Sequence, residues 1–200
     1  MLNIQLLDSP HSFAANTYLI SSGCEYAIVD PTAPYERGLV SGEVRYILLT
    51  HAHFDHILEV EGWATSGAQV IILSDEAMAL SDPMRKFIKL YNGSDNGYFG
   101  QVTAVKDGDT LPLGDTEIKV IATPGHTIGS AIYLVEDVAF VGDTVFEGGG
   151  FGRYDLPTGN LVMLRESIRR ITALPDKTHL LPGHGGATTV KQYKQDLIIR

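Results

Sequence analysis

VRYILLTHAHFDH, residues 44–56, is the stretch of the chain that decides its fold. Its first seven residues, Val44–Thr50, form a continuous apolar run that predicts a strand buried on both faces. Three histidines and an aspartate follow directly, in the pattern His-x-His-x-Asp-His. Because residues i and i+2 of an extended strand point to the same side, His51 and His53 can bind one metal ion together. A turn into a helix would carry the next two ligands to a neighbouring position. Polar groups crowded at the end of an apolar strand are costly without a cation, so the cluster predicts a metal site.

Three further candidate ligands occur downstream, in turns or at the end of a strand. Pro124-Gly125-His126 recurs as Pro182-Gly183-His184, and in each case glycine permits a tight turn that projects the histidine back toward the first cluster. Asp143 ends another strand-like run. Judged by its own sequence context alone, each of these three residues is as compatible with a structural role as with metal binding. The other two histidines, His11 and His179, lack such a context, and we expect them to be ordinary.

Strand-like and helix-like segments alternate in both halves of the chain, which indicates an α/β protein with a pseudo-duplicated arrangement. Strands are expected at residues 4–7, 15–21, 25–30, 44–50, 69–73, 117–122, 131–135, 138–142 and 179–181. Helices are expected at residues 58–66, 82–90, 161–173 and 190–200. Residues 91–100 and the glycine-rich stretch 147–160 are expected to be loops. A loop as long as the second one is often functional inside a compact domain.

Composition narrows the class of protein. The chain has 200 residues, 44% of them hydrophobic and 20% charged, which predicts one compact domain over residues 1–200. The net charge of -9 argues against a nucleic-acid partner, because proteins that bind nucleic acids usually carry a basic patch. The sequence has no stretch of about 18 apolar residues and no signal-peptide pattern, so no membrane association is expected. A single cysteine, Cys24, allows no intrachain disulfide and suits a reducing cytoplasm, which is the expected location.

The metal-site residues resemble the metallo-β-lactamase superfamily, whose hallmark is H-x-H-x-D-H followed by a lone His, an Asp and a final His. All seven positions are met, by His51, His53, Asp55, His56, His126, Asp143 and His184. The resemblance implies an α/β fold, a four-layer αββα sandwich with two mixed sheets and the metals at one edge. It implies that one metal is held by His51, His53 and His126. It assigns a second metal to Asp55, His56 and His184, with Asp143 bridging the two.

Within the superfamily, the chain is most similar to the glyoxalase II (hydroxyacylglutathione hydrolase) group. The motifs that carry this likeness are Ala15–Ile20, Thr123–Thr127, Gly142–Phe146 and Gly152–Pro157. The last resembles a G-R-[TS]-D motif, with Tyr154 in place of the small hydroxyl residue, and Arg153 and Tyr154 are candidate substrate contacts. Long members of the group carry a C-terminal helical glutathione-binding domain, which we do not expect here. Glutathione as the carrier thiol is therefore left open.

The resemblance implies hydrolysis of a thioester, a small-molecule substrate. Two divalent ions, zinc foremost with iron or manganese as alternatives, would lower the pKa of a shared water to give a metal-bound hydroxide. Asp55 and Asp143 are the predicted catalytic residues, since they would orient the hydroxide as well as bind metal. The alternatives are a mononuclear-iron persulfide dioxygenase, a lactonase or phosphodiesterase on the same site, and a non-catalytic metal-binding module. The sequence leaves the oligomeric state open.

Overall fold

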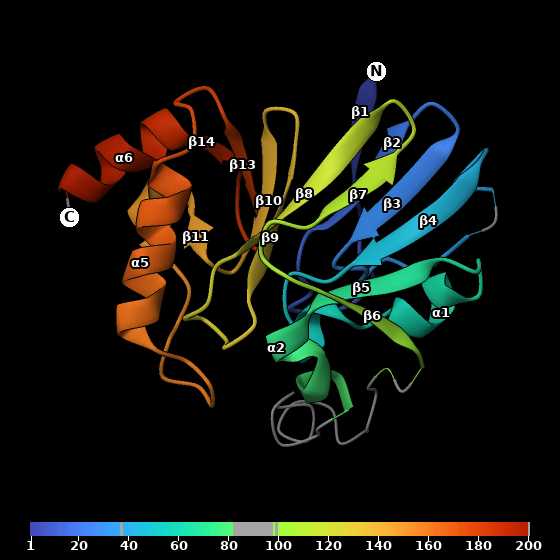
Figure 1. Cartoon of the computed structure of the whole chain (residues 1–200), viewed down its shortest axis with the longest axis horizontal. Helices are drawn as coiled ribbons and strands as arrows, with labels where there is room; N and C mark the ends of the chain where they lie inside the picture. The colour runs from blue at the N-terminus through green and yellow to red at the C-terminus, as the bar shows by residue number, and fades with distance from the viewer. Residues whose placement is uncertain (37, 82–97, 99, 200) are drawn as a thin grey trace.

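Two six-stranded sheets lie face to face, with helices on their outer sides (Figure 1). The computed structural model describes residues 1–36, 38–81, 98 and 100–199. Both sheets contain parallel and antiparallel neighbours. The predicted four-layer αββα sandwich with two mixed sheets is therefore confirmed.

The first sheet has the strand order β1-β2-β3-β4-β5-β6. Its first three strands pair antiparallel and the remaining pairs are parallel. Its strands are β1 (Leu2–Leu7), β2 (Thr17–Ser22), β3 (Glu25–Val29), β4 (Glu43–Leu48), β5 (Gln69–Leu73) and β6 (Val102–Val105). On its outer side lie the short helices α1 (Val60–Ala64) and α2 (Ser74–Ala77).

The second sheet has the order β14-β13-β10-β9-β8-β7, and only its β10–β13 pair is parallel. Its strands are β7 (Thr110–Leu113), β8 (Thr116–Ala122), β9 (Ala131–Val135), β10 (Val138–Gly142), β13 (His179–Pro182) and β14 (Thr188–Thr189). Helices α5 (Leu161–Thr172) and α6 (Val190–Ile199) cover its outer face.

The core consists of three apolar layers. One layer lies between the sheets, a second lies beneath α1 on the first sheet, and a third lies beneath α5 and α6 on the second. Strand β4 explains the apolar run in the sequence: Tyr46 and Leu48 face the layer between the sheets, while Val44 and Ile47 face the layer beneath α1. A strand between two apolar layers needs apolar side chains on both faces.

The structure corrects several sequence-based boundaries. The helix expected at residues 58–66 is shorter: a 3₁₀ turn, Phe54–His56, comes first, and α1 begins only at Val60. The stretch 147–160 is only partly a loop, because β11 (Val145–Phe146) and β12 (Gly150–Phe151) form a small hairpin around the 3₁₀ turn Glu147–Gly149. The helix expected at 82–90, most of the loop expected at 91–100 and Arg200 lie outside the described residues.

Candidate metal centre

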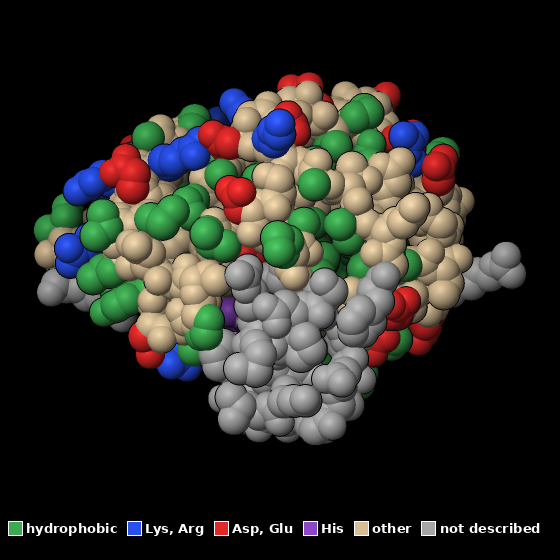
Figure 2. Space-filling model, turned by 60° about the horizontal axis from the view of Figure 1, so that its bottom comes forward, with side chains coloured by type: hydrophobic (Ala, Val, Ile, Leu, Met, Phe, Trp, Pro, Cys, Tyr) green, Lys and Arg blue, Asp and Glu red, His purple; other side chains and the backbone are tan. Residues whose placement is uncertain are grey.

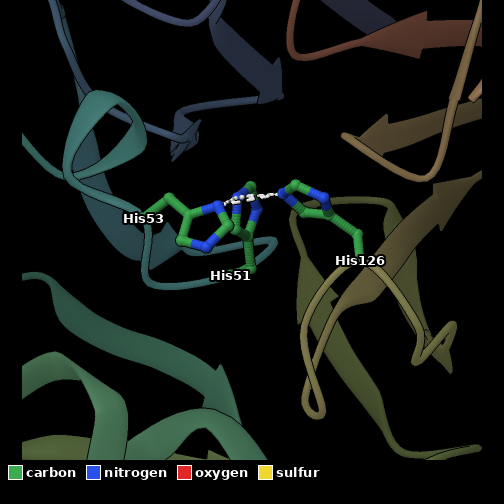
Figure 3. A group of neighbouring side chains, drawn as sticks. All are labelled: His51, His53 and His126. Atoms are coloured by element: carbon green, nitrogen blue, oxygen red, sulfur yellow. Dashed lines mark hydrogen bonds between the residues drawn. The ribbon is translucent and has the colours of Figure 1, made fainter. Parts of the chain in front are cut away.

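Three histidines from two sheets converge on one point (Figure 3). His51 and His53 follow β4, and His126 lies in the loop between β8 and β9. The Nε2 atom of His51 lies 3.0 Å from Nδ1 of His53, and Nε2 of His126 lies 3.2 Å and 2.9 Å from these two atoms. Three nitrogens that surround one zinc ion tetrahedrally at about 2.0–2.1 Å stand about 3.3 Å apart, so the triangle has the right size for one ion. We call this the three-histidine group.

In His51 and His126, the hydrogen bond made by Nδ1 shows that Nε2 turns a lone pair toward the centre. The hydroxyl of Thr50 donates a hydrogen bond to Asp30 and is 3.1 Å from Nδ1 of His51, so it accepts a hydrogen bond from the N–H of that ring. The Nδ1 atom of His126 donates to the carbonyl oxygen of Arg153 at 2.7 Å. In both neutral rings Nε2 is thus an acceptor, and acceptors crowded together repel unless a cation lies between them. The residues fit a metal ion.

A second group of ligands lies beside the first. Asp55, His56 and His184 offer ligand atoms that all lie within 4.8 Å of one another, and we call them the mixed group. Nε2 of His184 is 3.2 Å from Oδ2 of Asp55. Asp143 lies between the groups, since its Oδ2 is 3.7 Å from Nε2 of both His126 and His184. The structure therefore brings together all seven predicted ligands.

Two buried atoms of this centre are left without a protein partner. Within the described part of the chain, Nε2 of His56 and Oδ1 of Asp143 are the buried side-chain atoms that make no hydrogen bond. They face each other at 3.3 Å. Nδ1 of His56 lies 2.8 Å from a carboxylate oxygen of Asp30, to which it donates, so Nε2 is the nitrogen that His56 turns toward Asp143. Such orphaned atoms are rare in native proteins and are what a bound cation would satisfy.

The electrostatics of the cluster keep the three-histidine group and Asp143 ready to bind a metal at neutral pH, whereas His56 must first lose a proton. Burial, and next the neighbouring imidazoles, lower the pKa of His51 well below its usual range and that of His53 to about 3. Burial would raise the pKa of Asp143, but the imidazoles, His56 foremost, hold it well below its usual range. Burial alone would lower the pKa of His56, but Asp143 and Asp30 together raise it well above that range. A metal binds neutral imidazole and ionised carboxylate, so the three-histidine group and Asp143 are in the correct protonation state.

Glycines allow the ligand loops to approach one another. A Cβ atom on Gly183 would lie 2.4 Å from Oδ1 of Asp143 and 2.5 Å from Cε1 of His56. The residue before His184 therefore cannot carry a side chain. The two Pro-Gly-His turns are held from outside: Ser167 donates to the carbonyl of Pro124, and Tyr18 donates to that of Pro182.

Comparison with known proteins identifies the family. Residues 12–184 match the family model described as the Metallo-beta-lactamase superfamily. The chain belongs to the metallo-β-lactamase superfamily. Members of this superfamily are largely metal-dependent hydrolytic enzymes that bind divalent ions, and the histidine–aspartate cluster is the corresponding metal centre of this chain.

Its relatives span nearly the whole fold. An uncharacterised protein of Aquifex aeolicus is 35% identical over 183 residues, which cover 84% of this chain and 82% of the relative. The solved structure of BLEG-1 B3 metallo-beta-lactamase is 30% identical and covers 98% of this chain and 97% of its own, with a TM-score of 0.85. The structure of TTHA1623 in a di-iron-bound form is 24% identical, covers 96% and 98% of the two chains with a TM-score of 0.81, and shows the same fold.

In this member of the metallo-β-lactamase superfamily, the two candidate substrate contacts lie on the surface beside the centre. The carbonyl of Arg153 orients His126, while its guanidinium forms a two-pronged ion pair with Asp155, both bonds measuring 2.9 Å. Tyr154 is 40% exposed. His11 pairs with Glu59 outside the metal centre. The substrate role predicted for Arg153 and Tyr154 remains a prediction.

The metal centre reaches the surface. The His184 side chain is 37% exposed, whereas the other histidine ligands are buried. Histidine atoms are visible at the surface in the space-filling view (Figure 2). A small molecule can therefore approach the mixed group from solvent. Among the helices that the structure describes, none is long and apolar enough to cross a membrane.

Sequence reasoning missed one residue of the centre, Asp30. This carboxylate is 2% exposed and accepts hydrogen bonds from the backbone N–H and the hydroxyl of Thr50 and from His56. A signal was present, because Asp30 directly follows strand β3, next to the strand that precedes the histidine cluster.

The single cysteine, Cys24, lies in the turn between β2 and β3, where it is exposed.

Proposed function

We propose that this chain is a metal-dependent hydrolase that cleaves thioesters of the hydroxyacylglutathione type with two divalent ions, zinc foremost. The observation that carries the proposal is the pair of adjacent ligand groups with Asp143 between them. His51, His53 and His126 would hold one ion, and Asp55, His56 and His184 the other. When bound, two such ions lower the pKa of a water to near neutrality and polarise the substrate carbonyl.

The side chains of the centre would hold and orient that water. Asp143 presents Oδ1 with no hydrogen bond and stays ionised at neutral pH, because the imidazoles keep its pKa low. Burial would raise the pKa of Asp55, but the hydrogen bond to His184 and the charge of His56 lower it. Both carboxylates can accept a hydrogen bond from the water, which fixes the direction of attack.

The low pKa values of both carboxylates favour a thioester over an amide. An amine leaving group must be protonated as the C–N bond breaks, and a carboxyl group with a lowered pKa is a poor donor near pH 7. A thiol ionises at a pKa of about 8.5, so a thiolate can leave without a general acid. The chemistry of the ligands thus supports an acyl compound with a sulfur leaving group.

We further propose that Arg153 and Tyr154 contact a small-molecule substrate. The Arg153 side chain is 58% exposed, so an anionic carboxylate of the carrier thiol can compete with Asp155 for it.

A second candidate function, β-lactam hydrolysis, is favoured by the 30% identity to a B3 metallo-beta-lactamase over nearly the full length of both chains.

The test combines metal analysis with a substrate panel. Protein as purified is analysed for zinc, iron and manganese, and then assayed with S-lactoylglutathione, a lactone, a phosphodiester and a β-lactam. We expect two ions per chain, thioester turnover, and a loss of about 100-fold or more in His53→Ala, since a metal supplies several kcal/mol to the transition state. His179→Ala, an exposed histidine outside the centre, is the matched control and should keep full activity.

Other outcomes select other functions. Turnover of the β-lactam alone would replace the thioesterase with the second candidate. One iron per chain, with oxygen consumed in the presence of glutathione persulfide, would assign the dioxygenase chemistry of the sequence-based alternative. A rate on all substrates equal to that of His53→Ala would remove the hydrolase proposal.

A further inference from the structure

A buried carboxylate outside the ligand set joins the two loops that carry the three-histidine group. Glu76 lies in α2, just after β5 of the first sheet, and is 2% exposed. Its Oε1 accepts a hydrogen bond from the backbone N–H of Ala52 at 3.1 Å. Its Oε2 accepts one from the backbone N–H of Gly129 at 3.0 Å. One side chain thus holds the backbone of both loops.

Both acceptor bonds fall next to ligands. Ala52 stands between His51 and His53, so its N–H belongs to the backbone that sets the direction of both rings. Gly129 comes three residues after His126 in a tightly bonded turn, where Gly125 donates to the carbonyl of Thr127. Fixing Gly129 therefore restrains His126. Both contacts are with backbone groups, so they act on the metal ligands through the loops that carry them.

The shape of the contact supports a specific fit. A Cβ atom on Gly129 would lie 2.3 Å from the backbone nitrogen of Glu76 and 2.4 Å from its Cβ atom. Only glycine allows the loop from the second sheet to come this close to the helix on the first. The approach of the two backbones and the two hydrogen bonds are thus separate features of one junction.

We propose that Glu76 is a positioning residue that aligns His126 with His51 and His53 and so sets the metal affinity of the three-histidine group. This inference rests on the proposed function, because it requires that the group binds an ion. The three nitrogens come from different sheets and must stay within 2.9–3.2 Å of one another. A carboxylate shared between the two loops fixes their distance in a way that packing alone does not.

The test measures metal affinity rather than activity. Zinc is titrated out of wild-type protein with a series of chelators, and His53→Ala and His184→Ala mark which step belongs to which group. The variant Glu76→Gln keeps the size of the side chain but turns an N–H donor toward one of the two backbone N–H groups. We expect the ion of the three-histidine group to bind about 10–100-fold more weakly, as for other residues that orient metal ligands, with the other ion changed less than about threefold.

Glu25→Gln is the matched control. Glu25 also accepts a backbone N–H from the opposite sheet, that of Gly114 at 2.8 Å, but it lies at the start of β3, the end remote from Asp30. A merely structural carboxylate should behave like this one, with a lower melting temperature and unchanged zinc affinity. If Glu76→Gln behaves in the same way, or weakens both ions equally, the inference is wrong.

A second variant covers the case in which Glu76→Gln does not fold. Gly129→Ala disturbs the same junction from the loop side and should weaken the same ion selectively. Equal affinities in folded Gly129→Ala and wild type would overturn the inference. If wild-type protein binds no metal at all, the proposed function fails together with it. If the wild type binds two ions and the variants match it, only the role of Glu76 is lost.

Discussion

At the scale of the residue, the centre depends on hydrogen bonds that commit one nitrogen of a ring away from the metal. Asp30 does this for His56, and through the hydroxyl of Thr50 it also orients His51. The backbone of Asp30 adopts a φ of 47°, a left-handed conformation that is costly for a residue other than glycine. The hydrogen bonds of Asp30 to Thr50 and His56 hold this residue in its strained conformation, which places its carboxylate beside the metal ligands.

Asp30→Asn should weaken the mixed group. The amide can accept fewer of the three hydrogen bonds that the carboxylate accepts, so His56 or Thr50 loses its partner. We expect the zinc ion of the mixed group to bind about 10–100-fold more weakly. Chelator competition, with His184→Ala as the marker, measures the change. A variant that binds both ions as the wild type does would contradict this role of Asp30.

Acid should destabilise the metal-free protein through His53. Its pKa is about 3 in the folded state and about 6.5 when unfolded, so between these values only the unfolded chain takes up the proton. The stability that His53 contributes is complete above about pH 6.5 and is lost as the pH falls toward 3. His56 has the opposite sign, since its raised pKa gives stability that is lost as the pH rises.

Denaturant titrations at pH 7.5 and 5.0 on chelator-treated protein measure this effect. Lowering the pH by about 1.5 units below 6.5 should cost the wild type about 2 kcal/mol from His53 alone. Asparagine does not titrate between pH 5.0 and 7.5, so the free energy of unfolding of His53→Asn should fall by about 2 kcal/mol less than that of the wild type. An identical acid response in the two proteins would show that His53 is not kept neutral by the fold.

At the scale of the element, α5 is docked onto the turn that carries His126. Asn160 caps the helix by accepting the N–H groups of Val162 and Met163, and its own N–H donates to the carbonyl of Gly125 at 2.8 Å. The cap therefore joins the start of the helix to the residue before a metal ligand. A helix that begins at this point restrains the turn as well as covering the sheet.

Asn160→Ala should lower the stability of the fold by about 1 kcal/mol, because two N–H groups of the first turn lose their acceptor. Thermal or denaturant unfolding measures the loss. Asn160→Asp keeps an acceptor oxygen at the same position and should recover most of it. Equal stability of the alanine variant and the wild type would show that solvent replaces the cap at no cost.

Elements with a strong local pattern were predictable from the sequence, and those that depend on distant partners were not. The run Val44–Thr50 predicts β4 because its apolar residues serve two core layers. The hairpin of β11 and β12 is formed by two-residue strands, which leave no periodicity to read. Asp30 and Glu76 look like ordinary acidic residues in the sequence, since their partners lie 20–26 and 24–53 residues away. The seven ligands could be identified because their spacing is a family pattern.

At the scale of the whole molecule, the metal centre joins the two sheets. Four of the seven ligands follow β4 in the first sheet, and the others come from the loop after β8, from the end of β10 and from the loop after β13 in the second sheet. Hydrogen bonds already join the sheets at this edge, such as that from the N–H of Ala131 to the carbonyl of Thr50 at 2.8 Å. An ion bound to ligands of both sheets acts as a cross-link between them.

Chelation should therefore lower the stability of the entire fold and not just of the loops. An ion that binds only the folded state stabilises it by about 4.1 kcal/mol at 1,000 times its dissociation constant. For a chain of this size each kcal/mol corresponds to about 2–4 °C, so the melting temperature should fall by about 8–16 °C after metal removal. Protection of amide hydrogens should drop in both sheets, since both lose the cross-link. His53→Ala removes one ligand of the three-histidine group and should respond to chelator by a smaller shift, whereas His179→Ala should follow the wild type. Loss of protection confined to residues 51–56 would mean that the ion orders its own loop and leaves the joining of the sheets to their apolar core.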